Sequence, residues 1–395
     1  MNYILFDDQC RNNLLPLTFT RPAAEIRVGI LTIREKWESR LHKKCSWNTL
    51  KYLSAKYPLQ TGADNILING RLIPDTLLMD AIQSLRTKDV LQFQNIPLAV
   101  RLPEEDTRNF VPASVSKYTA VEYKKEPVII SNPWDIFKIN GEAIQKDFEY
   151  LTANRESGEL SASNNILGKD NIFVEPGVKA EFATINAFNG PVYLGKDTEI
   201  MEGSLIRGPF AICEGSTLKL GAKIYGPSTI GPQCKVGGEV NNSVFFGYSN
   251  KAHDGFLGNS VIGEWCNIGA DSNNSNLKNN YAEVKLWNYD KESFIKTGLQ
   301  FCGLIMGDHS KCGINTMFNT GTVIGVSANI FGSGFPRNFI PSFAWGGAHG
   351  YTTYSLPKAF ETAKLVMSRR NKEFNDIEKK IFREIYDFSE KYRKF

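Results

Sequence analysis

The chain has 395 residues, of which 42% are hydrophobic and 22% are charged, and its formal net charge is +4. These values are typical of a folded protein with two or three domains, and they exclude a largely disordered chain. The small net charge argues against a nucleic-acid coat and is compatible with phosphorylated ligands.

The chain also lacks the sequence signals of export and membrane insertion. Its seven cysteines are scattered without a CxxC pair, which predicts free thiols in a reducing compartment. The start, MNYILFDDQC, has acids where a signal peptide has a basic segment and an apolar core. No run of 18 apolar residues occurs, so we expect no membrane span. The sequence therefore predicts a cytoplasmic protein.

Residues 1–157 have the alternating strands and helices of an α/β domain. The expected strands are NYILFDD (2–8), NILINGRLI (65–73) and EPVIISN (126–132), and the expected helices are TLLMDAIQSL (76–85) and WDIFKINGEAIQKDFEYL (134–151). Such alternation favours a parallel sheet with crossover connections, here a Rossmann-like domain. Its ligand crevice is expected beyond the carboxyl ends of the strands.

Residues 158–350 have a different periodicity. Apolar residues recur about every six positions, usually before a glycine and a turn, as in VYLGKD-TEIMEG-SLIRGP and LIMGDH-SKCGIN-TMFNTG. This period is too short for a helical repeat and does not match a half-buried strand. It indicates a hexapeptide β-helix, in which each coil has three short faces and each face places one apolar residue in a narrow core.

One segment interrupts this period. Between Asn276 and Gly303 the six-residue repeat is lost, and charged and aromatic residues replace it. The stretch AEVKLWNYDKESFIKTG predicts a hairpin that leaves the coil. Loops that leave a solenoid usually have a binding or assembly role.

Residues 351–395 predict a C-terminal helix. Ser355 is the expected N-cap, with Pro357 in the first turn. Apolar residues recur at three- and four-residue steps, which predicts a stripe that packs on the solenoid or on a second subunit. The cations of this segment are expected on its solvated face: Arg369, Arg370, Lys379, Lys380 and Arg383.

His253, one of only four histidines, lies in SNKAHDGFLG next to Asn250 and Lys251. An imidazole can take a proton from an amine near neutral pH, and acyl transfer to an amino sugar needs such a base. It also needs donors for the thioester oxyanion and cations for phosphate. About one coil later, NIGADSNNSNLKNN supplies Asn276 and Lys278, which a solenoid can bring beside the first cluster. Many of these asparagines also suit the ordinary role of corner residues.

The segment NKAHDGFLGNSVIGEWCNIGADSNNSN resembles the active-site segment of a bacterial family, the bifunctional N-acetylglucosamine-1-phosphate uridylyltransferase/glucosamine-1-phosphate N-acetyltransferases. The whole chain resembles the Bacteroidetes-type variant of that family. His253, FLG, VIG and NIGAD match its KxxH…YLG…IG…NIGAG…N pattern. The resemblance implies that His253 is the catalytic base, that Asn276 contacts acetyl-CoA and that Lys251 is the basic residue before the base. Phe256, without a hydroxyl, stands where the family's aromatic contacts sugar phosphate.

The resemblance also has implications for assembly and for the N-terminal domain. It implies a left-handed β-helix that forms a homotrimer, with active sites between subunits. It aligns the family's GxGTRM…PK triphosphate loop with LLPLTFTRPAAEIRVGILTIREKW, which lacks the glycine before its arginine. Arg21, Arg27 and Lys36 are the candidate nucleotide and phosphate contacts, because their charge can neutralise phosphates. Surface cations of a strand-to-helix connection are the alternative interpretation.

The nucleotidyl transfer that this family performs uses Mg²⁺, whose ligands the sequence leaves open. The family's metal-binding aspartate would lie near LINGRLIPD, where Asn69 and Arg71 stand instead. Asp7 and Asp8, after the first expected strand, are the candidates to replace it.

Together these features predict an enzyme of sugar-nucleotide biosynthesis. It would transfer acetyl from acetyl-CoA to a hexosamine 1-phosphate, such as glucosamine 1-phosphate, and uridylyl from UTP to the resulting sugar phosphate. The alternatives are an acyltransferase with a degenerate nucleotide- or sugar-binding N-domain, a nucleotidyltransferase that uses dTTP, a zinc lyase of the γ-carbonic anhydrase type, and a non-catalytic scaffold. The spacing of His253, His309 and His349 does not suit the zinc lyase. No nucleic acid or membrane partner is expected.

Overall fold

The computed structural model describes residues 1–395, which form two compact units. One unit consists of Met1–Leu14, Thr20–Ile26 and Leu31–Asn132, and the other of Leu15–Phe19, Arg27–Ile30 and Pro133–Phe395. The predicted domain limits at residues 157 and 350 stay predictions. None of the helices is both long and apolar enough to cross a membrane.

The first unit contains a six-stranded sheet of order β2-β1-β3-β5-β4-β6. Its strands are β1 (Asn2–Phe6), β2 (Cys45–Asn48), β3 (Asp64–Asn69), β4 (Asp89–Phe93), β5 (Ile96–Pro103) and β6 (Thr119–Glu122), and its helices are α1 (Ile33–Leu41), α2 (Thr76–Gln83) and α3 (Glu104–Arg108). The pairs β1–β2, β1–β3 and β4–β6 are parallel, whereas β5 runs antiparallel to β3 and β4. The sheet is therefore mixed, not wholly parallel as predicted.

The predicted strand at 126–132 is also wrong. That segment makes only an isolated bridge between Ile129 and Leu72. The strands expected near residues 2 and 65 and the helix expected near residue 76 are present. Capping fixes where α1 begins, since Thr32 and Glu35 exchange side-chain and backbone hydrogen bonds in a capping box.

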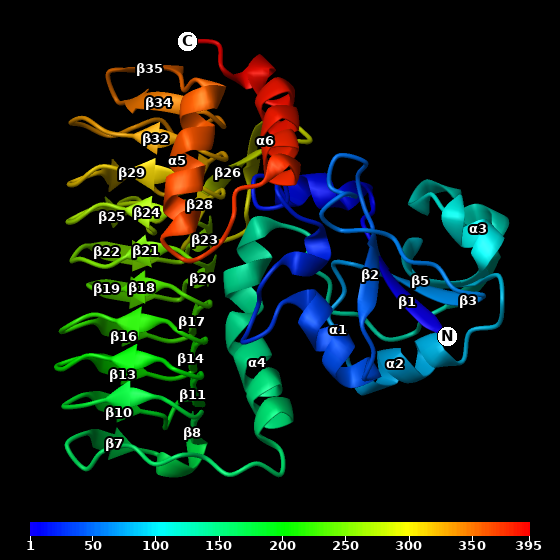
Figure 1. Ribbon diagram of the computed structural model, residues 1–395, viewed down its shortest axis with the longest axis horizontal. Helices are drawn as coiled ribbons and strands as arrows, with labels where there is room; N and C mark the ends of the chain where they lie inside the picture. Colours follow the sequence, from blue (N-terminus) through cyan, green and yellow to red (C-terminus); the bar gives the residue numbers. More distant parts are fainter. The chain divides into compact units, whose positions relative to one another are not determined.

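The second unit is built on a three-sided parallel β-helix, which confirms the predicted fold class (Figure 1). The first face holds β7 (Asn165–Leu167), β10 (Thr184–Asn186), β13 (Leu205–Arg207), β16 (Lys223–Tyr225), β19 (Glu239–Asn241) and β22 (Phe256–Gly258), and is continued by the pair β25 (Asn273–Asn274) and β30 (Met317–Phe318). The second face holds β8 (Ile172–Val174), β11 (Val192–Leu194), β14 (Phe210–Ile212), β17 (Ser228–Ile230), β20 (Val244–Gly247), β23 (Val261–Glu264), β28 (Leu304–Met306), β31 (Thr322–Ile324) and β33 (Phe339–Ile340). The third face holds β9 (Lys179–Ala180), β12 (Glu199–Ile200), β15 (Thr217–Leu218), β18 (Lys235–Val236), β21 (Asn250–Lys251), β24 (Asn267–Ile268), β29 (Lys311–Cys312), β32 (Asn329–Ile330), β34 (Ala344–Gly347) and β35 (Gly350–Thr353).

The predicted hairpin outside the coil is confirmed. Strands β26 (Lys285–Asn288) and β27 (Ser293–Lys296) pair antiparallel. Trp287 of this hairpin stacks on Phe339 of the second face with ring centroids 4.2 Å apart. Glu292 at its tip pairs with Lys391 near the end of the chain. The excursion therefore folds back onto its own unit.

Three helices accompany the β-helix. Helix α4 (Pro133–Thr152) runs along the stack of coils on the second face, where Gly141 lies against Pro227 (Figure 1). The C-terminal segment forms two helices, α5 (Leu356–Ser368) and α6 (Asp376–Phe388), instead of the single predicted helix. The break has a local cause, because Asn375 accepts hydrogen bonds from the first backbone N–H groups of α6. Ser355 occupies the N-cap of α5 without a side-chain capping bond.

Candidate functional site

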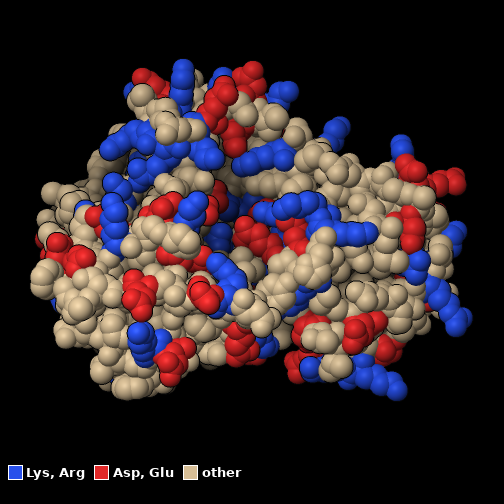
Figure 2. Space-filling model, turned by 60° about the horizontal axis from the view of Figure 1, so that its bottom comes forward, with Lys and Arg blue, Asp and Glu red and all other residues tan.

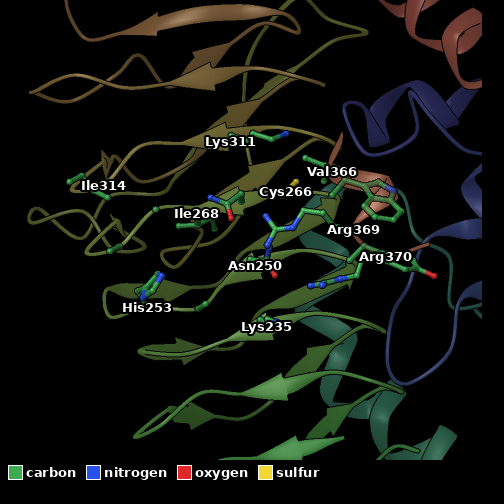
Figure 3. A pocket seen from close by; sticks show the side chains of 16 residues that line it. Lys235, Asn250, His253, Cys266, Ile268, Lys311, Ile314, Val366, Arg369 and Arg370 are labelled. Atoms are coloured by element: carbon green, nitrogen blue, oxygen red, sulfur yellow. The ribbon is translucent and has the colours of Figure 1, made fainter. Parts of the chain in front are cut away.

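A pocket of about 610 Å³ lies on the third face of the β-helix, beside the end of α5 (Figure 3). Strands β18, β21, β24 and β29 form its floor, and the turns after β21, β24 and β29 form one end. Its polar and aromatic lining includes Lys235, Tyr248, Asn250, His253, Trp265, Asn267, Lys311, Arg369 and Arg370.

His253 lies in the turn between β21 and β22, and its side chain is exposed. Its neighbours in the column of turns are small. Gly238 faces it in the preceding coil, where an added Cβ would lie 2.8 Å from the His253 carbonyl oxygen, and Ala270 follows in the next coil. Of the four histidines, only His253 lines the pocket. The turn therefore presents one accessible imidazole.

The pocket is lined by cations and by no carboxylate. Lys235 and Lys311 project from β18 and β29, and Arg369 and Arg370 follow the last residue of α5 (Figure 3). Burial lowers the pKa of Lys311 to about 8, and its Nζ donates to the carbonyl oxygen of His309 at 2.8 Å. On the face that Figure 2 shows, acidic and basic side chains are interspersed over most of the surface. The local excess of cations suits an anionic ligand.

Two amides lie in the middle of the pocket. Asn250 and Asn267 are paired residues of neighbouring strands β21 and β24. The side-chain Oδ1 of Asn250 is buried and has no hydrogen-bond partner. A buried acceptor without a partner is costly, so a rotation of the Asn250 side chain that brings this oxygen to an N–H or O–H group of a ligand would be favourable.

Aromatic rings line the end of the pocket away from His253. Tyr248 and Trp265 stack with ring centroids 4.3 Å apart and planes 14° apart. Both residues occupy corner positions with positive φ, 54° and 61° respectively. Burial is the main cause of a raised pKa for the Tyr248 hydroxyl. The two rings are uncharged and form an apolar wall of a pocket that is otherwise basic.

Three of the five site residues predicted near His253 lie outside this pocket. Lys251 is only 1% exposed and donates to backbone carbonyl groups. Asn276 donates to Oδ1 of Asn259 at 2.8 Å, and Lys278 donates to the carbonyl oxygen of Glu283 at 3.0 Å. The structure thus brings His253 and Asn250 together, and a ligand contact for the other three stays a prediction.

The predicted phosphate-binding residues divide between the two units. Arg21 and Lys36 belong to the first unit and are buried there. Arg27 belongs to the second, where its Nε donates to the carbonyl oxygen of Phe246 at 3.2 Å. The guanidinium of Arg27 thus binds the backbone of the second face. Phosphate binding by these three residues stays a prediction.

The carboxylates after β1 do not fit a magnesium site. Asp7 forms an ion pair with Arg11 at 3.1 Å and accepts a hydrogen bond from the Thr49 hydroxyl at 2.5 Å. Asp8 accepts two hydrogen bonds from Arg71, at 2.9 and 2.5 Å. Burial is the main cause of a raised pKa for Asp7. Residues 1–395 contain no group of three or more His, Cys, Asp or Glu side chains that could hold a metal ion.

Sequence reasoning missed the basic lining of the pocket. Arg369 and Arg370 were expected on a solvated helix face. Arg369 is exposed and Arg370 is half-buried, and both follow the end of α5 and line the pocket on the third face. Lys235 and Lys311 had no distinguishing neighbours in the sequence. Both lysines occupy outward-facing positions on the third face. They could have been grouped from the sequence only if the register of the coils were known.

One family model matches the N-terminal part of the chain. Residues 3–156 match the family model described as sugar nucleotidyl transferase. The match covers the first unit and α4, which packs on the β-helix. No curated protein matches the chain.

Several solved structures are similar to the chain. They include the UDP-N-acetylglucosamine acyltransferase of Arabidopsis, with 17% identity over 54% of this chain and 80% of that one and a TM-score of 0.24. The UDP-N-acetylglucosamine acyltransferase LpxA of Bacteroides fragilis has 14% identity over 60% of this chain and 84% of that one, with a TM-score of 0.26. A variant of the Bacillus cereus N-acyltransferase AntD, in complex with dTDP and coenzyme A, has 10% identity over 53% of this chain and 87% of that one, with a TM-score of 0.23.

Proposed function

We propose that the β-helix transfers an acetyl group from acetyl-CoA to the amine of a hexosamine 1-phosphate, with His253 as general base. The observation that carries this proposal is the pocket itself, which has one imidazole at one end and cations without carboxylates along its length. Both proposed substrates carry phosphate, and one of them must lose a proton during the reaction. The pocket offers a group for each need.

The chemistry requires only one proton carrier. The sugar nitrogen attacks the thioester carbonyl carbon, and His253 removes the proton from that nitrogen as the C–N bond forms. The C–S bond then breaks, and the imidazolium returns the proton to the departing sulfur. The products are an N-acetyl sugar phosphate and coenzyme A, and the imidazole ends in its starting state.

The remaining residues have binding roles in this proposal. Lys235, Arg369 and Arg370 neutralise phosphate groups, and the planar guanidinium groups can bind phosphate through two hydrogen bonds. Asn250 lines the pocket, and its unpartnered Oδ1 would accept an N–H or O–H of a substrate once the side chain turns toward it. Lys251 is buried and does not line the pocket, and substrate or acetyl-CoA contacts of Asn276 and Lys278, which do not line it either, stay predictions.

A second activity is proposed for the first unit, which is uridylyl transfer from UTP to the acetylated sugar phosphate. The match of residues 3–156 to sugar nucleotidyl transferases supports it. The arginine-paired carboxylates of Asp7 and Asp8 count against it, because they do not suit Mg²⁺. Transfer from dTTP, or binding of a sugar nucleotide without transfer, are the alternatives for this unit.

The proposed enzyme is a cytoplasmic homotrimer. The corner that carries His253 also carries exposed apolar side chains, Leu220 at 67% and Ile314 at 70% exposure. A second copy of the chain would cover these side chains and enclose the imidazole. Light scattering of the purified protein tests the assembly, and a monomer at micromolar concentration would contradict it.

The function is tested by offering the purified protein a panel of hexosamine phosphates with acyl-CoA thioesters, and UTP or dTTP with the acetylated products. We expect thiol release with an amino sugar 1-phosphate and acetyl-CoA. Pyrophosphate release without thiol release would assign the chain to nucleotidyl transfer alone. Absence of both would leave the scaffold interpretation.

A further inference from the structure

Lys251 occupies a position of the β-helix that is otherwise apolar. It lies in register with Val236 of the preceding coil, and both side chains point into the core. The corresponding residues along the third face are buried and uncharged: Ala180, Ile200, Leu218, Val236, Ile268, Cys312 and Ile330. One coil therefore has a lysine where the fold calls for an aliphatic residue.

The amine of Lys251 binds the turn that carries the imidazole. Its Nζ donates to the carbonyl oxygen of His253 at 2.8 Å and to that of Gly237 at 3.0 Å. These bonds connect the His253 turn to the turn of the preceding coil. No side-chain acceptor is involved, so the bonds fix the main chain of the turn and leave the imidazole free to face the pocket.

Gly238 makes room for this contact. Its φ is +69°, and an added Cβ would lie 2.8 Å from Lys251 Nζ and 2.8 Å from the His253 carbonyl oxygen. The close approach of the two turns thus depends on a residue without a side chain. The glycine, the amine and the carbonyl group form one packed unit behind the imidazole.

Stability does not account for a lysine at this position. Burial lowers the pKa of Lys251 to about 8, which shows that the charged amine is disfavoured there. Replacing buried charges by apolar groups of similar volume is often neutral or stabilising. The hydrogen bonds from its amine to the carbonyl groups of the two turns explain a lysine at this otherwise apolar position better.

We propose that Lys251 is a positioning residue, whose two hydrogen bonds to the His253 and Gly237 carbonyl groups hold the imidazole of His253 in its reactive place. The role rests on the proposed acetyl transfer for its catalytic meaning. Its structural part, the fixed position of His253, can be measured without activity.

The test compares Lys251→Met with Leu218→Met, a substitution in the same apolar column two coils away. We expect Lys251→Met to fold, to lower kcat by roughly 100-fold and to leave KM unchanged, because a small displacement of a catalytic group has an effect of that size. Leu218→Met should leave kcat unchanged.

The second readout is the NMR signal of His253 in protein labelled at histidine Cε1. The chain has only four histidines, so His253→Ala assigns the signal. We expect the signal to shift or broaden in Lys251→Met, and the other three to remain in place. A His253 signal identical to that of the parent protein would overturn the proposal, whatever happens to kcat.

A second pair of variants disturbs the same contact from the opposite side. Gly238→Ala places a methyl group against Lys251 Nζ. Gly221→Ala is the control, because Gly221 has the same φ of +69° and no atom lies within 4 Å of the position of its added Cβ. We expect the kcat loss and the altered His253 signal in Gly238→Ala alone. Equal behaviour of the two alanine variants would overturn the proposal, and this pair decides the matter if Lys251→Met does not fold.

These readouts separate the positioning role from the proposed function. If the parent protein releases no thiol from acetyl-CoA, the proposed function fails, and the His253 signal still decides whether Lys251 holds the turn. If the parent is active and the His253 signal moves only in Lys251→Met and Gly238→Ala, both proposals stand.

Discussion

The backbone N–H of Gly29 donates to Oδ1 of Asn140 at 2.8 Å, although 111 residues separate them in the chain. The next residue, Ile30, donates in the same way to Oδ2 of Asp147, also at 2.8 Å. Asn140 and Asp147 are buried residues of α4, and the Arg27–Ile30 segment lies against them within the second unit. Two polar side chains of α4 thus bind the main chain of the Arg27–Ile30 segment, which we call the strap.

Gly29→Ala should release this strap. The φ of Gly29 is +75°, and an added Cβ would lie 2.6 Å from Asp147 Oδ2 and 2.8 Å from the Ala143 carbonyl oxygen. Strained φ costs about 1–3 kcal/mol, and a clash in a packed interior adds a similar amount. We expect the free energy of unfolding, measured by urea titration, to fall by about 2–6 kcal/mol.

Gly298→Ala is the matched control for that loss. Gly298 has the same φ of +75°, and nothing lies within 4 Å of the position of its added Cβ. It should therefore show only the cost of backbone strain. Equal losses in the two variants would contradict the contact between the strap and α4.

The β-helix could be predicted because its signal repeats. Each coil needs an apolar residue on every face, so errors at one hexad are corrected by its neighbours. The mixed sheet of the first unit could not, because β5 pairs antiparallel with β3 through contacts that no local pattern records. The break between α5 and α6 has a readable signal in Asn375, which an apolar stripe alone does not reveal.

The site was predictable only where its residues are neighbours in sequence. His253 lies in the turn that directly follows the strand of Asn250, whereas Arg369 lies over a hundred residues later. The position of Lys251 was hidden by uneven coils. Backbone N–H groups donate to side chains of the preceding coil, and the spacing of these pairs gives the length of each coil. The spacing is 18 residues from Ser216 to Cys234, 15 from Cys234 to Ser249 and 17 from Ser249 to Cys266. A strict six-residue count therefore drifts there, and it does not show which residue faces the core.

His253→Ala should remove the base of the proposed acetyl transfer. General-base catalysis contributes roughly 10²–10⁴-fold, so we expect kcat for thiol release from acetyl-CoA to fall within that range. His349→Ala is the control, because His349 is exposed, forms a hydrogen bond of 3.2 Å with the Ser333 hydroxyl and lies outside the pocket. Unchanged thiol release in His253→Ala would remove this residue from the mechanism.

Replacing Arg369 and Arg370 together by methionine should weaken binding of the phosphorylated substrates. Hydrogen bonds to charged groups contribute about 1.5–3 kcal/mol, so we expect KM to rise by roughly 10- to 100-fold with a smaller change in kcat. Added salt should raise KM of the parent protein more than KM of the variant, because the lost contacts are ionic.

Arg383→Met provides the comparison for the arginine pair. Arg383 is an exposed cation of α6 and does not line the pocket. The Arg383→Met substitution lowers the net charge of the protein without changing the proposed phosphate contacts. The same rise of KM in Arg383→Met would show that general surface charge, and not the pocket, is responsible.

The buried amine of Lys251 should make stability depend on pH. Its pKa is about 8 in the folded protein, against 10.5 for an unburied lysine, mainly because burial disfavours the charged form. Between these values the unfolded chain binds more protons than the folded protein, so the free energy of unfolding rises with pH. The groups that oppose the shift are Asp254, Asp271 and Cys312. The full gain from pH 8 to 10.5 is on the order of 3 kcal/mol.

Lys251→Met removes that titration. The free energy of unfolding of the variant minus that of the parent should therefore be highest below pH 8. We expect this difference to fall as pH rises toward 10, because only the parent gains stability over that range. Urea titrations at intervals from pH 7 to 10 measure the difference directly. Lys235→Met, on the exposed side of neighbouring β18, should follow the parent curve throughout. Parallel curves for Lys251→Met and the parent would mean that the amine is solvated, and hence that it does not lie in the core column against the His253 turn.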